Sequence, residues 1–169
     1  EKCSKGIFQE FGKSNFSTEV AEAYQDLAGF GTSCLQFDVK TKDAQFDGFN
    51  FRACHLAEVV ISESEEGRID TVFRKLKLTA RQAYQKFGKD CGDKALKALE
   101  KDPDKEFEYI QAVIPRELKG EPAMVAPPHQ RPYACYYISV IDKKICKESG
   151  YYELPYMVPR WGKTTGDVY

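Results

Sequence analysis

The chain has 169 residues, enough for one α+β domain or for one core with a smaller appendage. With 42% hydrophobic residues, among them 11 Phe and 10 Tyr, it can bury an aromatic core, which argues against disorder over most of its length. The formal net charge of -1 argues against a general grip on nucleic-acid phosphates, because that attraction requires an excess of basic side chains.

Two helices are expected near the start of the chain. Ile7, Phe8 and Phe11 indicate a short helical stretch, and the apolar periodicity of residues 17–28 predicts a longer helix. Neither helix is long enough or apolar enough to span a membrane, and no signal peptide is visible. The chain opens without a methionine, and both ends look internal, so we expect a piece of a longer protein.

Alternation of apolar and polar residues predicts an antiparallel sheet. Residues 35–39 and 49–53 form a hairpin across the polar loop 41–48. Further strands are predicted over residues 57–64 and 68–78 about a turn at Gly67, over 107–114 and 133–141, and over 145–147 and 151–153 as a final hairpin through Gly150.

Two more helices are predicted among these strands. Thr79 and Gln82 have the spacing of a capping box, in which each side chain bonds the other residue's backbone N–H, and Gly88 supplies the stop. A second helix covers residues 93–101, because Pro103 prevents its continuation. The proline-rich stretch 115–132 is predicted to be a loop.

Together these elements predict an α+β fold with an antiparallel, partly barrel-like sheet and short helices packed to one side. We expect a helical lead-in over residues 1–33 and a sheet-rich core over 34–161, with its helices near 79–88 and 93–101. Residues 162–169 form a final short segment.

Candidate chemical motifs have plainer explanations. Gly162-Lys163-Thr164 lacks the earlier glycine of a phosphate loop, whose place Met157 occupies, so we expect a surface turn. Cys54 and His55 are adjacent on a strand, so their side chains point to opposite faces and cannot act as nucleophile and base.

Metal and disulfide chemistry are not favoured either. His55 and His129 are far apart in the sequence, and no closely spaced cysteines accompany them as zinc ligands. The cysteines lack a C-x-x-C pair and a secretion signal, so we expect buried or half-buried thiols rather than disulfides: Cys3, Cys34, Cys54, Cys91, Cys135 and Cys146.

A basic stretch crosses the predicted strand 68–78 and the helix after it. Since neighbouring strand residues alternate between faces, these side chains cannot all line one groove, and we expect a solvated outer face. The stretch comprises Arg68, Arg74, Lys75, Lys77, Arg81, Lys86 and Lys89.

Four motifs follow one another in the second half of the chain: residues 65–74 (EEGRIDTVFR), 78–82 with 87–88 (LTARQ, FG), 107–116 ending in Pro-Arg, and 154–161 with 166–169 (LPYMVPRW, GDVY). In order and approximate spacing they resemble segments of the portal, or head-to-tail connector, proteins of short-tailed bacteriophages. The resemblance extends over residues 48–169 and is less specific in the N-terminal third.

The resemblance implies a structural subunit of a ring, usually twelvefold, at one capsid vertex of a virion made in the bacterial host cytoplasm. Through such a ring double-stranded DNA is packaged and ejected, and capsid, packaging terminase and tail adaptor proteins dock on it. This chain would be the outer, wing-like domain, with residues 162–169 starting the lead into an absent stem. It would bind DNA little by itself, and the resemblance implies no enzyme, metal or cofactor.

The motif residues are therefore expected to serve structure and interfaces. Pro155 and Pro159 would set a rigid extended lead into the stem, since proline fixes φ and biases the preceding residue away from helix. The full set is Gly67, Arg68, Asp70, Arg74, Thr79, Arg81, Gln82, Phe87, Gly88, Pro115, Arg116, Pro155, Tyr156, Pro159, Arg160, Trp161, Gly166 and Tyr169.

Two alternatives remain open from the sequence. One is another virion or protein-interaction module of similar fold. The other is a cysteine-dependent hydrolase, which would require Cys54, His55 or His129 to converge with a carboxylate in a cleft.

Overall fold

The computed structural model describes residues 2–42, 45–117 and 126–162, and the chain divides into two compact units. The hairpin unit comprises Glu1–Ala57 and Pro155–Tyr169, and the five-stranded unit comprises Glu58–Leu154. The hairpin unit therefore combines the two ends of the chain, a division that the sequence patterns do not mark.

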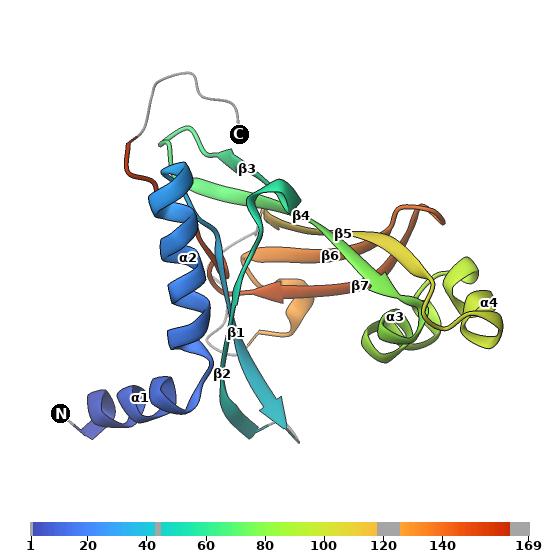
Figure 1. The fold of residues 1–169 in the computed structure, drawn as a ribbon, viewed down its shortest axis with the longest axis horizontal. Helices are drawn as coiled ribbons and strands as arrows, with labels where there is room; N and C mark the ends of the chain where they lie inside the picture. Colours follow the sequence, from blue (N-terminus) through green and yellow to red (C-terminus); the bar gives the residue numbers. More distant parts are fainter. Residues whose placement is uncertain (1, 43–44, 118–125, 163–169) are drawn as a thin grey trace. The chain divides into compact units, whose positions relative to one another are not determined.

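The hairpin unit contains a three-stranded antiparallel sheet in the order β2-β1-β8, with α2 packed against β2 and β1 (Figure 1). The predicted hairpin is confirmed, but its strands extend into the predicted loop 41–48, and residues 43–44 lie outside the described residues. The elements are α1 (Lys2–Lys13), α2 (Phe16–Phe30), β1 (Leu35–Lys42), β2 (Gln45–Ala53) and β8 (Tyr156–Met157).

The core of this unit is aromatic, as the composition predicts. Phe51 is buried, and the rings of Phe11 and Phe16 lie 5.5 and 4.9 Å from it between centroids. Phe11 and Phe16 meet edge to face at 5.0 Å, a favoured geometry for aromatic pairs. The core thus joins α1 and α2 to the hairpin at the corner between the two helices.

The five-stranded unit is an antiparallel meander in the order β3-β4-β5-β6-β7, with α3 and α4 at one end (Figure 1). β6, predicted from residues that are apolar on both faces, is an interior strand. The elements are β3 (Val59–Glu63), β4 (Ile69–Thr79), α3 (Ala80–Phe87), α4 (Asp93–Lys101), β5 (Glu106–Pro115), β6 (Tyr133–Ser139) and β7 (Lys144–Tyr151), with short 3₁₀ turns at Leu56–Glu58, Gly88–Asp90 and Pro128–Gln130.

Helix α3 begins as predicted. The Thr79 hydroxyl accepts from the Gln82 N–H at 3.2 Å, and the Gln82 side chain accepts from the Thr79 N–H at 3.0 Å. The helix buries Phe87, whose ring lies 5.3 Å from both Tyr109 and Tyr137. The capping box therefore fixes where the chain leaves β4, and Phe87 anchors the far end of α3 to the sheet.

Two expectations are wrong. The α+β class is confirmed, but the sheet is not barrel-like: the strands form two separate open sheets. The final hairpin does not form, because β7 runs without a turn from Lys144, paired with Ser139, to Tyr151, paired with Tyr133. Gly150 marks close packing rather than a turn, since a Cβ there would clash with the Pro128 carbonyl oxygen.

Candidate interaction surface

The first motif forms the turn between β3 and β4. Gly67 has φ of 73° and donates its N–H to the Ser64 carbonyl at 2.8 Å, and the Ser64 N–H donates to the Arg68 carbonyl at 2.8 Å. Arg68 and Glu66 lie 3.8 Å apart with both side chains exposed, an arrangement that stabilises little. Asp70 follows on β4, half-buried.

Arg74 and Arg116 hold strands in place. Arg74 is buried on β4, with Nη2 3.5 Å from a carboxylate oxygen of Glu58. Arg116, which follows Pro115 at the end of β5, donates from Nη1 to the Pro128 carbonyl at 2.9 Å and pairs through Nη2 with the Glu148 carboxylate. The Pro-Arg motif therefore links β5 to β7 and to the turn at 128–130.

The motif residues around α3 also make their contacts within the five-stranded unit. Arg81 donates its backbone N–H to the Pro103 carbonyl at 3.1 Å, and its side chain lies 3.8 Å from Asp104. Gly88 ends the helix with φ of 62°, where its N–H bonds the Tyr84 carbonyl. This positive φ is the conformational reason for glycine at the stop.

The last motif belongs to the hairpin unit. The Pro155 carbonyl accepts from the Phe37 N–H at 2.8 Å, and the Pro159 carbonyl accepts from the Ser33 N–H at 3.2 Å. The Trp161 N–H donates to the Gly31 carbonyl at 2.9 Å.

Between Pro155 and Trp161, Tyr156 and Arg160 also pair with residues in the range 31–37. Tyr156 is buried opposite Gln36, and Arg160 forms a bridge with Thr32. Sequence patterns missed this pairing, because two paired residues in β8 are too few to establish an alternation. Gly166 and Tyr169 lie outside the described residues.

On β4 the basic stretch alternates between faces as predicted, but the expectation of a solvated outer face is wrong for Arg74. Arg74 is buried, while the neighbouring Lys75 is exposed and donates to Glu108 at 2.8 Å. This hydrogen bond lowers the pKa of the Glu108 carboxyl below its usual range. On α3, the Lys86 ammonium lies 4.4 Å from the Tyr137 ring centroid. Lys75 and Lys86 thus face an acidic and an aromatic partner.

Cys54 and His55 differ in environment, but their predicted place on a strand is wrong, because β2 ends at Ala53. The Cys54 thiol is buried and donates to the Arg52 carbonyl at 3.6 Å. His55 is exposed, and its Nδ1 accepts from the Ala57 N–H at 3.2 Å. The Cys54 thiol and the His55 ring therefore each bond a nearby backbone group. These contacts do not support a nucleophile–base pair.

The predicted thiols are confirmed where side chains are placed. Cys34, Cys54, Cys91, Cys135 and Cys146 are all buried and not in disulfides, whereas the side chain of Cys3 is not described. Across residues 2–42, 45–117 and 126–162, no cluster of three His, Cys, Asp or Glu residues is arranged to hold a metal ion.

A buried polar group lies at the centre of the five-stranded unit. The Tyr109 hydroxyl donates to the Cys91 carbonyl at 2.7 Å, and burial raises the pKa of this phenol well above its ordinary value. Burial likewise raises the pKa of the Cys91 and Cys146 thiols. These groups therefore stay protonated at neutral pH, and the tyrosine ties the loop after α3 to β5.

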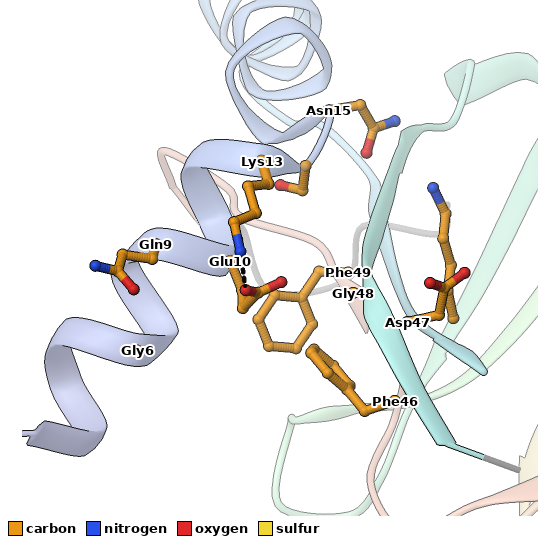
Figure 2. A pocket seen from close by; sticks show the side chains of 11 residues that line it. Gly6, Gln9, Glu10, Lys13, Asn15, Phe46, Asp47, Gly48 and Phe49 are labelled. Atoms are coloured by element: carbon orange, nitrogen blue, oxygen red, sulfur yellow. Dashed lines mark hydrogen bonds and ion pairs between the residues drawn. The ribbon is translucent and has the colours of Figure 1, made fainter. Parts of the chain in front are cut away.

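The hairpin unit has an open groove of about 930 Å³ between α1 and β2 (Figure 2). On the α1 side, Lys13 and Glu10 form an ion pair at 2.6 Å. On the β2 side the groove is lined by Phe46, Asp47 and Phe49. The groove is lined by polar, charged and aromatic side chains, and the Lys13 and Glu10 charges on α1 neutralise each other. The groove therefore does not indicate one class of ligand.

Exposed apolar side chains are the more distinctive surface feature. Phe8, Tyr24, Phe30 and Trp161, all in the hairpin unit, are exposed by 79, 66, 74 and 72%. Aromatic side chains are enriched at protein–protein interfaces relative to the rest of the protein surface. The fold and its surface therefore define a structural interaction module, in which charged residues hold turns and strands and aromatic residues remain exposed.

The chain belongs to the family of bacteriophage head to tail connecting proteins, whose family model matches residues 1–169. It is 28% identical over 173 aligned residues to the portal protein of Salmonella phage epsilon15, covering all of this chain and 30% of that protein. It is 26% identical over 162 residues to the probable portal protein of Bordetella phage BPP-1, covering 94% of this chain and 28% of that protein.

These comparisons confirm the resemblance to portal proteins of short-tailed phages. The family is structural, in agreement with the expectation of a protein that is not an enzyme. The chain spans less than a third of the length of either relative. No helix in the described ranges has both the length and the apolar character that a membrane span requires.

Proposed function

We propose that this chain is an outer, wing-like part of a phage portal protein, a ring at one capsid vertex through which double-stranded DNA is packaged and ejected. The observation that carries the proposal is the family match over residues 1–169. The names of the two relatives, portal protein and probable portal protein, support it. In this role the chain is structural, and it lies in the virion after synthesis in the bacterial cytoplasm.

The charge distribution suits a structural part of a DNA passage. The chain has 25 basic and 26 acidic side chains, and basic groups such as Lys75 and Arg116 face carboxylates. The attraction of a protein for DNA grows with the number of phosphates that its basic groups neutralise, and a near-neutral chain offers few such groups. We therefore propose little direct DNA binding by this chain.

The proposed partners are other copies of the same protein, the capsid, the packaging terminase and a tail adaptor. Within this proposal the motif residues keep their structural role: the Gly67 turn, the Thr79–Gln82 cap and the Arg116 link shape the five-stranded unit. The Pro155 and Pro159 carbonyls bind the returning chain to the hairpin unit. We further propose that residues 162–169 begin the lead into the stem of the ring.

Electron microscopy of the full-length protein tests the proposal. We expect rings with a central channel. Persistent monomers under packaging-like conditions would contradict the portal role. In a parallel assay, fluorescence anisotropy with a labelled DNA duplex should detect no saturable binding by the 169-residue chain at physiological salt; tight binding would contradict the proposal that this part binds little DNA.

A further inference from the structure

Two buried cysteines lie opposite each other at the open end of the hairpin that β1 and β2 form. Cys34 immediately precedes β1, and Cys54 immediately follows β2. The Cys54 N–H donates to the Cys34 carbonyl at 2.8 Å. This bond continues the register of the two strands by one residue beyond the pair of Leu35 and Ala53. Residues directly opposite in an antiparallel pair point to the same face of the sheet, so the two thiols share one face.

The separation that this pairing imposes suits a disulfide. Opposite residues in a hydrogen-bonded antiparallel pair have Cα atoms about 5.5 Å apart, and disulfides span Cα separations of about 4.4–6.8 Å. The Cβ atoms of opposite residues are about 4.5–5.5 Å apart, whereas a disulfide holds them at about 3.5–4.5 Å, so the two residues must approach by about 1 Å. The bond is therefore strained, and strained disulfides are the ones that are readily reduced again.

The two cysteines on strands of the five-stranded unit have no cysteine opposite them. Cys135 on β6 is paired with Val113 on β5 and with Ser149 on β7. Cys146 on β7 falls at the irregularity of the β6–β7 register, where no opposite residue is assigned to it. Within the described ranges, Cys34 and Cys54 are thus the cysteines that strand pairing brings together.

The two thiols lie where three segments of the hairpin unit meet. Directly before Cys34, the Ser33 N–H donates to the Pro159 carbonyl at 3.2 Å, so this part of the chain contacts both the end of β2 and the returning chain. Cys34 and Cys54 are exposed by only 1 and 0%, so an oxidant reaches them only when the end of the hairpin opens. Local opening costs least at frayed ends and most in the centre of a core strand, so this position is accessible in time despite its burial.

We propose that Cys34 and Cys54 form a reversible redox pair, with two thiols under reducing conditions and a cross-strand disulfide under oxidising ones. In the oxidised state the bond ties the start of β1 to the end of β2 and locks this end of the sheet. The setting of the inference rests on the proposed function, because a protein made in the reducing cytoplasm meets oxidising conditions once the virion has left the cell.

The oxidant in the proposed step is a small-molecule disulfide such as oxidised glutathione. The thiolate of one cysteine attacks a glutathione sulfur, which breaks the glutathione disulfide, releases one glutathione thiolate and leaves a mixed disulfide on the protein. The thiolate of the other cysteine attacks the protein sulfur of the mixed disulfide and releases the second glutathione. The protein thus loses two protons and two electrons, and the two glutathione molecules take up both.

Mass spectrometry of the full-length protein tests the pair. Protein purified with a reductant is treated in its native state with oxidised glutathione, and the remaining thiols are then blocked with N-ethylmaleimide in urea. Trypsin places Cys34 in the peptide 14–40 and Cys54 in the peptide 53–68, each with no other cysteine. We expect most chains to yield these two peptides joined, and dithiothreitol to separate them. Peptides that stay unjoined, or that join to a different cysteine, would overturn the inference.

Hydrogen exchange gives a second readout of the lock. Oxidation should slow exchange of the amides in residues 35–53 by about tenfold or more, because a bond that closes a loop of this size opposes local opening. Cys34→Ser and Cys54→Ser should each abolish the slowing, whereas Cys135→Ser, which removes a buried thiol of the other unit, should retain it. Slowing that persists in either hairpin variant would contradict the lock. Electron microscopy of the same samples tests the ring separately: rings without the disulfide sink the inference alone, and the disulfide without rings counts against the proposed function alone.

Discussion

The side-chain amide of Asn15 pairs with both backbone groups of Phe51. Its Nδ2 donates to the Phe51 carbonyl at 2.8 Å, and its Oδ1 accepts from the Phe51 N–H at 2.9 Å. Glu19 continues this pattern by accepting from the Ala53 N–H. Phe51 and Ala53 lie on β2, the edge strand of the three-stranded sheet, so these side chains take the place of a neighbouring strand.

Replacing Asn15 with alanine should therefore destabilise the hairpin unit. Two backbone groups of β2 lose their partners, which costs on the order of 1–3 kcal/mol when the site stays buried and less when water enters. Urea unfolding measures the loss, and hydrogen exchange should quicken at the Phe51 amide. Unchanged exchange at Phe51 would contradict this role for Asn15. Ser17→Ala, an exposed change on α2, serves as the control.

Tyr109→Phe should lower the free energy of unfolding by about 1–3 kcal/mol at neutral pH, because the buried Cys91 carbonyl loses its donor. The variant should also change the pH dependence. Since the pKa of Tyr109 is raised in the folded state, its contribution is fully present below about pH 10, the ordinary pKa of tyrosine, and is lost as the pH rises further.

Denaturation curves under reducing conditions at neutral and alkaline pH measure this difference. The wild-type chain should lose more stability above about pH 10 than the variant. The Cys91 and Cys146 thiols, whose pKa values are also raised, add an alkaline loss that both proteins share. Equal alkaline slopes in the two proteins would show that Tyr109 does not carry the effect.

Gly150→Ala should disrupt the packing of β7 against the turn at 128–130. The added Cβ would clash with the Pro128 carbonyl oxygen and lie 3.0 Å from that of Tyr133, both of which belong to the backbone. We expect a loss of about 1–3 kcal/mol in the free energy of unfolding, the usual cost of overpacking. Gly29→Ala is the matched control, because its Cβ meets nothing within 4 Å in helix α2, and it should stabilise by about 0.5–1 kcal/mol. Equal effects at the two positions would rule out the steric explanation.

Thr79→Ala should cost about 1 kcal/mol through loss of the N-cap hydrogen bond of α3. Thr79→Ser keeps the hydroxyl and should retain most of the stability. Thermal unfolding of the two variants and the wild type distinguishes the stabilisation by the N-cap hydrogen bond from the stabilisation by the β-strand propensity of threonine. If serine destabilises as much as alanine, the hydroxyl is not the stabilising group.

The sequence by itself determined the local elements whose signals are contained within one turn or one helix. The capping box at Thr79 and Gln82, the Gly67 turn and the helix over residues 93–101 all formed as expected, because their hydrogen bonds join residues a few positions apart. The family resemblance likewise rests on short motifs that are legible in the chain.

Only the tertiary structure decided which distant segments belong together. The residues around Tyr156 do not indicate that it pairs with Gln36. The residues around Gly150 are compatible both with a turn and with a strand against which another turn packs closely, and only the structure shows that the second is correct. Whether an apolar face is covered depends on the same long-range packing: Phe11 and Phe8 share one face of α1, yet the core reaches only Phe11. Local sequence specifies the face, and packing between segments far apart in the chain decides how much of it remains exposed.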